Sequence, residues 1–332
     1  MRAVLQAAWL RRGPLAWLLL PVTALYAVLS AARRTLYRRG WFRAERVPVP
    51  IVVVGNVIAG GAGKTPVVMA VARHLRDRGI ACGVVSRGHG RRGDDCREVT
   101  PDSDPAEVGD EPLLIASLVR VPVVVARRRA AAVRELLDRH PEVRVVISDD
   151  GLQHLALARD VEVVVFDDRG IGNGWLLPSG PLRESWPRPA DLVVRSEGAQ
   201  GITGFIVKRR LAAEAVRADG TRVPLATFVG QRCNALAGIA RPEAFFDMLQ
   251  REGIALASAI ALPDHHDFAA PLPPLSPGLP LLCTEKDAVK LWKSHPDAWA
   301  VPLAVEIDPA FFERLDALLA PKLSSPHGSQ AA

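Results

Sequence analysis

A glycine-rich turn between a buried strand and a helix constrains the fold of this 332-residue chain more than any other feature. Residues 47–55 (VPVPIVVVG) are a short β-branched run of the kind that forms a fully buried strand. A helix is predicted over residues 64–78, and Gly79 ends it. The turn between them reads Gly60-Gly61-Ala62-Gly63-Lys64-Thr65. This order of strand, turn and helix predicts an α/β unit built on a mainly parallel sheet.

The sequence that follows repeats the alternation of strands and helices. Helices are predicted over residues 111–118 and in the arginine-rich stretch up to His140, and further buried strands over residues 81–86, 121–126, 143–148, 161–166 and 192–194. Because these strands lack the alternating polar pattern of a half-exposed sheet, we expect helices on both faces. The predicted fold class is α/β, a P-loop NTPase-like, mainly parallel sheet flanked by helices. Ligands of such sheets bind at the carboxyl ends of the strands.

Three regions are expected along the chain. Residues 1–45 form an apolar and basic N-terminal segment, residues 46–200 form the core domain that contains the glycine-rich turn, and residues 201–332 form a smaller α/β domain. In the last region the pattern predicts short strands and helices, at residues 202–229, 234–239, 242–252 and 281–284.

The glycine-rich turn has the composition of a phosphate-binding loop. Glycines let backbone N–H groups turn inward around phosphate oxygens, and the following helix N-terminus adds positive potential. Lys64 is expected to reach the β- and γ-phosphates of ATP, and the Thr65 hydroxyl is expected to bind Mg²⁺. The predicted nucleotide-binding residues are Ile58, Ala59, Gly60, Gly61, Ala62, Gly63, Lys64 and Thr65.

The loop departs from the strict pattern G-x-x-x-x-G-K-[ST] at its first glycine, which falls on Ile58. Gly60 and Gly61 are expected to supply the turn instead. A plain glycine-rich turn before a helix is the alternative interpretation. The deviant-loop ATPases that partition DNA or position division proteins usually have lysine where this chain has Ala59, which counts against them.

Asp149 and Asp150 follow the strand predicted over residues 143–148. An acid at this place is typical of the Walker B arrangement, in which a carboxylate holds Mg²⁺ opposite the P-loop threonine. Turn or helix-capping aspartates are the alternative. Two other clusters are weaker alone: Gly109-Asp110-Glu111-Pro112, where helix capping is the plain explanation, and Asp264-His265-His266-Asp267, which also suits an ordinary loop.

The N-terminal segment indicates a membrane surface as partner. Residues 15–32 (LAWLLLPVTALYAVLSAA) carry no charge and are about long enough to span a bilayer core. Up to Glu45 the chain has eight arginines and one acid, so this segment accounts for the whole net charge of +6. Positive charge beside an apolar segment favours anionic lipids over nucleic acid. A signal peptide, a spanning helix and a monotopic helix remain alternatives, with monotopic attachment favoured.

ATP chemistry and the cysteines both favour the cytoplasmic side. The periplasm lacks ATP, which argues against export. Cys82, Cys96, Cys233 and Cys283 lie far apart and form no CxxC pair. This spacing is typical of reduced, isolated thiols and not of a disulfide framework or a zinc site.

Several linked motifs occur in one order: VVGNVIAGGAGKTP, VVSRGHGRR, VGDEPLLIA, ISDDGLQH, LPSGPLRES, PDHHDF and CTEKDAVKL. Together with the apolar N-terminus they cover most of the chain, and the chain resembles the tetraacyldisaccharide 4′-kinase family of lipid A biosynthesis. The resemblance implies transfer of the ATP γ-phosphoryl group to the 4′-hydroxyl of a tetraacylated glucosamine disaccharide 1-phosphate, which forms lipid IVA. It places the enzyme on the cytoplasmic face of the inner membrane, with an acylated lipid substrate and no obligate protein partner evident.

The resemblance also implies roles for particular residues. Asp110 looks like the catalytic base for the sugar hydroxyl and His265 like its partner, with Lys64 as a further catalytic residue and Asp149 and Asp150 near Mg²⁺. Arginines that suit the substrate's anomeric phosphate are Arg87, Arg127, Arg128 and Arg129, although a solvated helix face also explains the last three. Gln153, His154 and Arg183 lie in matching motifs without an assigned role. The chain departs from the family where it has His89 instead of Tyr and Leu152 instead of Phe.

Two other classes of function are compatible with parts of the sequence. A membrane-bound regulatory P-loop NTPase would hydrolyse nucleotide without a lipid acceptor. A non-enzymatic membrane protein with a vestigial nucleotide fold would show no turnover, but Lys64, Thr65 and the acidic pair are intact.

Overall fold

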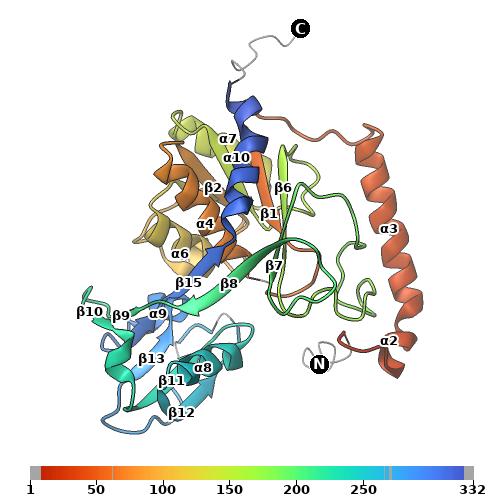
Figure 1. Ribbon diagram of the computed structural model, residues 1–332. Coiled ribbons are helices and arrows are strands. Elements are labelled where there is room, and N and C mark those ends of the chain that lie inside the picture. Colours follow the sequence, from red (N-terminus) through yellow and green to blue (C-terminus); the bar gives the residue numbers. More distant parts are fainter. Residues whose placement is uncertain (1–8, 62, 265, 269–270, 325–332) are drawn as a thin grey trace.

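The computed structural model of the protein describes residues 9–61, 63–264, 266–268 and 271–324, which form two β-sheets with helices around them (Figure 1). The larger sheet has nine strands. Their order across the sheet is β15 (Leu303–Ile307), β8 (Phe205–Leu211), β7 (Leu192–Ser196), β6 (Val161–Phe166), β1 (Ile51–Gly55), β5 (Val145–Asp149), β2 (Cys82–Ser86), β4 (Val123–Val125) and β3 (Arg97–Val99). The strands from β8 to β4 run parallel, and only the two edge strands, β15 and β3, pair antiparallel.

Helices cover both faces of this sheet, as its valine-rich strands predict. Side chains alternate between the faces along each strand, so Val52 and Val54 of β1 join one core and Ile51 and Val53 the other. The first core contains three helices, α4 (Lys64–Asp77), α6 (Asp110–Val119) and α10 (Pro309–Ser324). The second core contains α7 (Arg129–Arg139) and loop residues. Helix α5 (Pro105–Val108) is a short turn before α6.

The smaller sheet has six strands. Their order is β10 (Arg222–Pro224), β9 (Glu214–Val216), β14 (Trp299–Val301), β13 (Leu281–Thr284), β11 (Arg232–Ala237) and β12 (Ala255–Ala261). The 3₁₀ helix η1 (Leu225–Phe228) and helix α8 (Pro242–Arg251) pack on one face, and α9 (Glu285–Leu291) packs on the other. The prediction of a mixed α/β protein with a mainly parallel sheet is confirmed.

The two sheets do not divide the chain at the predicted boundary after residue 200. Strands β8 and β15 and helix α10 lie in the region 201–332, but they belong to the nine-stranded sheet and its core. The chain thus leaves the larger sheet after β8 and returns to it at β15. The physical reason is that α10 presents Phe311, Leu315 and Leu319 to the same core as β1, a long-range contact that local sequence patterns do not reveal.

The apolar N-terminal segment forms two helices at the side of the larger sheet, α2 (Pro14–Leu18) and α3 (Leu20–Arg38) (Figure 1). They are divided at Leu19. Pro21 lies in the first turn of α3, where the backbone N–H groups have no partner within the helix, so the N–H that proline lacks costs no helical hydrogen bond. Among the helices of the described residues, none is both long enough and apolar enough to cross a membrane.

Glu285, at the start of α9, is half-buried, and the charges of Arg73 on α4 and Arg222 on β10 act on it. Burial raises the pKa of Glu285 from 4.5 to about 7, and the two arginines oppose this only in part. The folded protein therefore holds this proton more tightly than the unfolded chain. Between about pH 4.5 and about pH 7 folding stability falls as the pH rises, because the carboxyl ionises freely in the unfolded chain while the buried carboxyl still holds its proton.

We expect Glu285→Gln to raise the melting temperature at about pH 8 by a few degrees, which corresponds to about 1 kcal/mol, and to change it little at about pH 5. The amide cannot ionise, so it avoids the cost that the carboxylate meets above its folded pKa. Thermal unfolding across this pH range measures the difference. Glu243→Gln is the matched control, since Glu243 is exposed in the first turn of α8. A difference between Glu285→Gln and wild type that does not vary with pH would contradict the assignment.

Candidate active site

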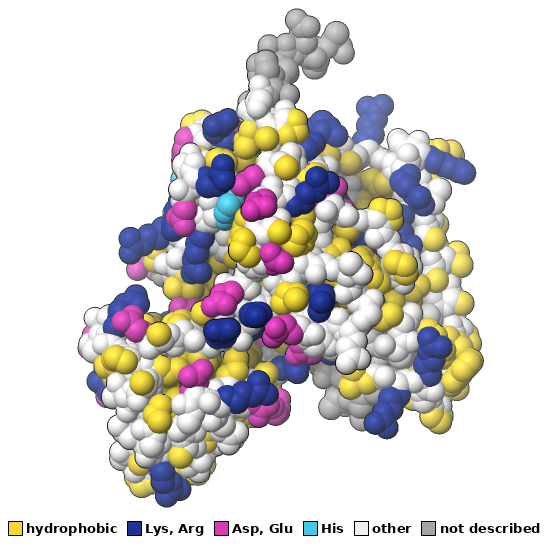
Figure 2. All heavy atoms as spheres, in the orientation of Figure 1, with side chains coloured by type: hydrophobic (Ala, Val, Ile, Leu, Met, Phe, Trp, Pro, Cys, Tyr) yellow, Lys and Arg dark blue, Asp and Glu magenta, His cyan; other side chains and the backbone are white. Residues whose placement is uncertain are grey.

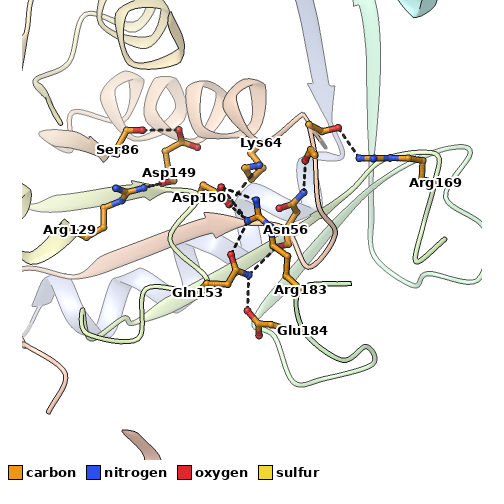
Figure 3. A network of polar contacts seen from close by, with 12 residues as sticks. Asn56, Lys64, Ser86, Arg129, Asp149, Asp150, Gln153, Arg169, Arg183 and Glu184 are labelled. Atoms are coloured by element: carbon orange, nitrogen blue, oxygen red, sulfur yellow. Dashed lines mark hydrogen bonds and ion pairs between the residues drawn. The ribbon is translucent and has the colours of Figure 1, made fainter. Parts of the chain in front are cut away.

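The candidate active site lies at the carboxyl ends of two neighbouring strands in the middle of the nine-stranded sheet. Strands β1 and β5 pair in parallel, with Val54 opposite Asp149. The glycine-rich loop, residues 58–65, therefore leaves β1 beside the acidic pair at the end of β5 (Figure 3). Ala62 is the one loop residue that lies outside the described residues.

Two glycines allow the shape of the glycine-rich loop. Gly60 and Gly63 have φ angles of 91° and 71°, in the left-handed region that other residues rarely adopt. At Gly63 an added Cβ would also lie 2.0 Å from a nitrogen of the Arg209 guanidinium. Ile58, at the place of the missing motif glycine, is fully buried in the second core and pairs with Leu182 through an isolated β-bridge. The departure from the strict motif therefore adds a core contact at the start of the loop.

Lys64 and Thr65 begin helix α4. The Nζ of Lys64 lies 3.7 Å from Oδ1 of Asp150, and the Thr65 side chain is buried. Within the part of the chain that the structure describes, no side-chain hydrogen bond caps the helix at Gly63. Its first N–H groups are thus oriented to receive an anion, as at other helix N-termini.

Asp149 is buried at the end of β5, with 1% of its surface exposed. Its Oδ2 accepts a hydrogen bond from Ser86 Oγ at 3.3 Å, but its Oδ1 has no hydrogen-bond partner among the described residues. Burial, together with the charge of Glu111, raises the pKa of Asp149 to about 7. A buried oxygen that lacks a donor is what a cation site requires.

Asp150 has the opposite surroundings. Its φ of 49° is in the left-handed region, and its carboxylate lies 3.7 Å from Lys64 Nζ and 3.1 Å from Arg183 Nη1. Burial raises the pKa of Asp150, but Lys64 and Arg183 outweigh this and hold the pKa below its usual value. The two adjacent aspartates therefore differ in charge balance, since the ion pairs with Lys64 and Arg183 are made by Asp150.

A chain of side-chain hydrogen bonds continues from Asp150 (Figure 3). Arg183 Nη1 also donates to Gln153 Oε1 at 2.9 Å. Gln153 Nε2 donates to the carbonyl of Asn56 at 3.2 Å and to Glu184 Oε1 at 2.7 Å. Gln153 and Arg183, which the sequence singled out without a role, thus hold Asp150 in place against the end of β1.

Asp110 lies at the start of α6, on the side of the site that faces the smaller sheet. It is 7% exposed, and Lys290 Nζ lies 2.7 Å from its Oδ1 and 2.8 Å from its Oδ2. Lys290 Nζ also donates to the carbonyl of His266 at 3.1 Å. Both side chains line a cavity of about 230 Å³. His89, which follows β2, and Lys293, which follows α9, also line it. His265, the predicted partner of Asp110, lies outside the described residues.

The four candidate arginines have different environments. Arg87, Arg127 and Arg128 are exposed, and Arg127 forms an exposed ion pair with Asp94. Arg129 is buried, donates to the carbonyl of Asp149 at 2.9 Å, and has a pKa that burial lowers to about 10. In this conformation Arg129 supports the end of β5 from within. A substrate-binding role for these arginines stays a prediction.

His154 lies beside this group. Burial and the charges of Arg129 and Arg87 lower its pKa to about 4. The imidazole is therefore neutral near pH 7, with one ring nitrogen available as donor and the other as acceptor.

Sequence patterns did not single out two residues of the candidate site. Lys290 belongs to the motif CTEKDAVKL but carries no independent signal, because its partner Asp110 is 180 residues away. Arg169 donates to the carbonyls of Ala59 and Gly61 in the glycine-rich loop. It follows the carboxyl end of β6 in the segment FDDRG, and the rule that ligands bind at strand ends could have indicated it.

The residues at the strand ends fit a magnesium ion shared with phosphates. In the part of the chain that the structure describes, no three acidic, histidine or cysteine side chains form a group that could hold a metal by themselves. Oxygens buried near the glycine-rich loop and lacking a described hydrogen-bond partner are Asp149 Oδ1, Ser148 Oγ and Asn56 Oδ1. Oxygen ligands, with only one or two from carboxylates and the rest from phosphate and water, are what Mg²⁺ prefers.

Comparison with solved structures supports the fold. The crystal structure of the LpxK from Aquifex aeolicus, described as an "apo" form in complex with ATP, superimposes with a TM-score of 0.79 at 30% sequence identity. The match covers 93% of this chain and 99% of the other.

Sequence relatives extend over nearly the whole chain. Proteins named tetraacyldisaccharide 4′-kinase are 59% identical in Acidovorax sp. (strain JS42), over 97% of this chain and 96% of the relative, and 46% identical in Chromobacterium violaceum, over 99% and 100%. A sequence model of the family described as tetraacyldisaccharide-1-P 4′-kinase matches residues 15–320. With 92% or more of the chain covered by each kind of comparison, the chain belongs to the tetraacyldisaccharide-1-P 4′-kinase family.

Proposed function

We propose that this chain transfers the γ-phosphoryl group of ATP to the 4′-hydroxyl of a tetraacyldisaccharide 1-phosphate, forming lipid IVA in lipid A biosynthesis. The observation that carries the proposal is that Lys64, Asp149 and Asp150 lie together at the carboxyl ends of β1 and β5, in a chain 59% identical to a tetraacyldisaccharide 4′-kinase. ATP is the phosphoryl donor in this proposal, and the acylated disaccharide is the acceptor. Neither a nucleic acid nor an obligate protein partner enters it.

In this proposal the glycine-rich loop is the P-loop of a P-loop NTPase-like core. Its backbone N–H groups and the start of α4 hold the phosphates, and Lys64 reaches the β- and γ-phosphates. Thr65, Asp149 and Asp150 are the residues proposed to hold Mg²⁺. The bound ion supplies positive charge against the phosphates. Asp149, whose Oδ1 lacks a hydrogen-bond partner within the described ranges, is the better candidate for direct contact, because Asp150 is already paired with Lys64 and Arg183.

Asp110 is proposed to accept the proton of the sugar hydroxyl. It is nearly buried, it lies at a helix start that favours a carboxylate, and it faces a cavity large enough for part of a sugar. Lys290 holds both of its oxygens and thereby fixes its orientation. His265 is proposed as its partner. Asp110 belongs to the proposed domain 46–200 and Lys290 to the proposed domain 201–332, so the site uses both.

The substrate's anomeric phosphate is proposed to meet the exposed arginines Arg87, Arg127 and Arg128, with Arg129 behind them. A guanidinium group matches phosphate in geometry and keeps its charge at all relevant pH values. The exposed position of the first three is compatible with a headgroup at the membrane surface.

The N-terminal helices α2 and α3 are proposed to lie on the cytoplasmic face of the inner membrane. They expose six large apolar residues, each between 54% and 75% exposed: Trp17, Leu18, Val22, Leu25, Val28 and Leu29. Figure 2 shows yellow apolar and dark blue basic side chains along this side of the molecule. The other side of α3 contacts the protein, where Tyr26 Oη donates to the carbonyl of Arg183 at 2.8 Å and Thr23 Oγ1 to Ser179 Oγ at 2.7 Å. An apolar outer face and arginines at the helix end suit monotopic attachment.

Leu25→Asp with Leu29→Asp is expected to lower the partition coefficient onto anionic vesicles by about 100-fold, because the variant removes two apolar contacts and adds two repelled charges. Cosedimentation with phosphatidylglycerol-containing vesicles measures it, and ATP affinity should not change. Val229→Asp is the matched control, since Val229 is another exposed apolar residue, remote in sequence from α3 and next to η1. Equal sedimentation of the double variant and wild type would rule out α3 as the anchor.

The decisive experiment is transfer of radiolabel from γ-labelled ATP to a tetraacyldisaccharide 1-phosphate in detergent micelles, beside a reaction without lipid. We expect label in the lipid. Label released as free phosphate at the same rate with and without lipid would reject the kinase and favour a membrane-bound regulatory NTPase.

A further inference from the structure

Arg169 lies across the outside of the glycine-rich loop (Figure 3). Its Nη1 donates to the carbonyl of Ala59 at 3.2 Å, and its Nη2 donates to the carbonyl of Gly61 at 2.9 Å. Between these two carbonyls, Gly60 has a φ of 91°, and a Cβ added to it would lie 3.3 Å from Arg169 Nη1. One guanidinium group thus bridges the carbonyls on either side of Gly60, whose backbone is in the left-handed region.

Arg169 is itself held by a buried carboxylate. Its Nε donates to Asp167 Oδ1 at 3.1 Å and to Oδ2 at 2.9 Å, and its backbone N–H donates to Oδ1 at 3.1 Å. Asp167 is 1% exposed at the end of β6, so its position is fixed by the sheet. Because Asp167 neutralises the guanidinium and the loop carbonyls occupy its outer nitrogens, Arg169 is not placed as a phosphate ligand.

The contacts of Arg169 determine where the loop's N–H groups point. In a trans peptide the carbonyl and the following N–H point in opposite directions. Holding the Ala59 carbonyl on the outside therefore directs the Gly60 N–H toward the other side of the loop. An empty loop without such a contact would have to lose conformational entropy when phosphates bind, at about 1–2 kcal/mol for each residue that becomes ordered.

The entry to the loop is held by a second, independent set of bonds. The Ala59 N–H donates to the carbonyl of Pro181 at 2.7 Å, and the Arg183 N–H donates to the carbonyl of Val57 at 2.7 Å. With Ile58 in the core, the first part of the loop is fixed by residues 181–183 and the glycine part by Arg169. Ile58, which stands where the strict motif has its first glycine, lies in the part of the loop that these backbone bonds hold.

We propose that Arg169 is a positioning residue for nucleotide binding, which keeps the glycine-rich loop in its phosphate-binding shape before ATP arrives. The inference rests on the proposed function only in that the loop binds ATP. It requires no particular lipid acceptor.

The test is direct measurement of nucleotide affinity by calorimetry, using a non-hydrolysable ATP analogue with Mg²⁺. Arg169→Gln should weaken binding by about 10-fold, which corresponds to about 1.4 kcal/mol of lost preorganisation. In turnover assays the KM for ATP should rise similarly, while kcat and the KM for lipid change by less than about threefold. Arg169→Lys, which cannot bridge two carbonyls and a carboxylate at once, should give an intermediate affinity.

Arg76→Gln is the matched control. Arg76 makes the same kinds of contact at the C-terminal end of α4, away from the glycine-rich loop, since it donates to the carbonyl of Val119 at 2.8 Å and pairs with Asp77 at 2.8 Å. Its loss should lower the melting temperature but leave nucleotide affinity unchanged.

Three outcomes separate the explanations. Unchanged affinity in both Arg169 variants overturns the inference, and so does an equal loss in Arg76→Gln, which would indicate general destabilisation. If Arg169→Gln does not fold, Arg169→Lys decides by the same measure. Absence of nucleotide binding in the wild type would instead reject the ATP site of the proposed function.

Discussion

Asp110→Asn is expected to lower kcat by about 10³-fold, within the range found for loss of a general base, while nucleotide affinity changes by less than about threefold. The amide has nearly the shape of the carboxylate but cannot accept the proton of a sugar hydroxyl. Asp110 lies at the start of α6, outside the glycine-rich loop, so the phosphate contacts should persist. Single-turnover transfer of the γ-phosphoryl group measures the chemical step, and calorimetry with an ATP analogue measures binding.

Lys290→Met distinguishes the base from the ion pair. Asp110→Asn also leaves Lys290 without its carboxylate, and removal of one member of a nearly buried pair typically costs about 3–5 kcal/mol of stability. If Asp110 served only to pair with Lys290, then Lys290→Met would reduce kcat as severely as Asp110→Asn. We expect the lysine variant to keep at least about 10-fold more activity, because the carboxylate remains. Normal turnover in Asp110→Asn would remove Asp110 from the mechanism.

Local sequence patterns predicted most strands of the larger sheet, because a buried strand can be identified from its own apolar run without knowing which strand it pairs with. The runs at β1, β2, β5 and β6 contain β-branched residues and end at, or directly before, a glycine, serine or aspartate, and each forms a parallel strand. What local patterns could not supply is the membership of β8, β15 and α10. These elements join the first core through contacts between residues far apart in sequence, such as the stacking of Phe312 on His74 of α4, and such contacts leave no periodic signal.

The candidate site shows the same limit. Lys64, Thr65, Asp149 and Asp150 were found because each stands at a fixed offset from a strand or helix end, and the topology of a parallel sheet brings such ends together. Lys290 and Arg169 were missed because their importance comes from what they touch. Lys290 contacts a carboxylate on another helix, and Arg169 contacts carbonyl groups, which are present at every residue and carry no signature in the sequence.

The different contacts of Asp149 and Asp150 could also be found only from the structure. The sequence gives two adjacent aspartates without a way to divide their roles. The left-handed turn at Asp150 places its carboxylate against Lys64 and Arg183, whereas Asp149 stays in the strand with one oxygen lacking a described donor. Lys64 is therefore already neutralised in this conformation. Binding of a nucleotide must compete with Asp150 for the lysine, unless a cation at Asp149 and Asp150 compensates the carboxylates.

Lys64→Met is expected to lower kcat/KM for ATP by about 10³-fold, or about 4 kcal/mol, because the variant removes the cation that is proposed to stabilise the charge on the transferred phosphoryl group. Methionine keeps much of the side chain's volume, so the packing at the start of α4 should persist. Arg183 still pairs with Asp150 in the variant, which limits the damage to the acidic pair. Initial rates over a range of ATP concentrations, at saturating lipid, measure the change.

Lys208→Met is the matched control for loss of a lysine charge. Lys208 lies on β8 and forms a partly exposed pair with Glu197 at 3.6 Å, a kind of contact that contributes little to stability. Its kcat/KM for ATP should stay within about twofold of wild type. Lys64→Arg should recover only part of the lost activity, since the charge returns but its longer, planar group does not fit the same position. Wild-type kcat/KM in Lys64→Met would mean that the phosphates bind elsewhere, and the proposed P-loop would have to be abandoned.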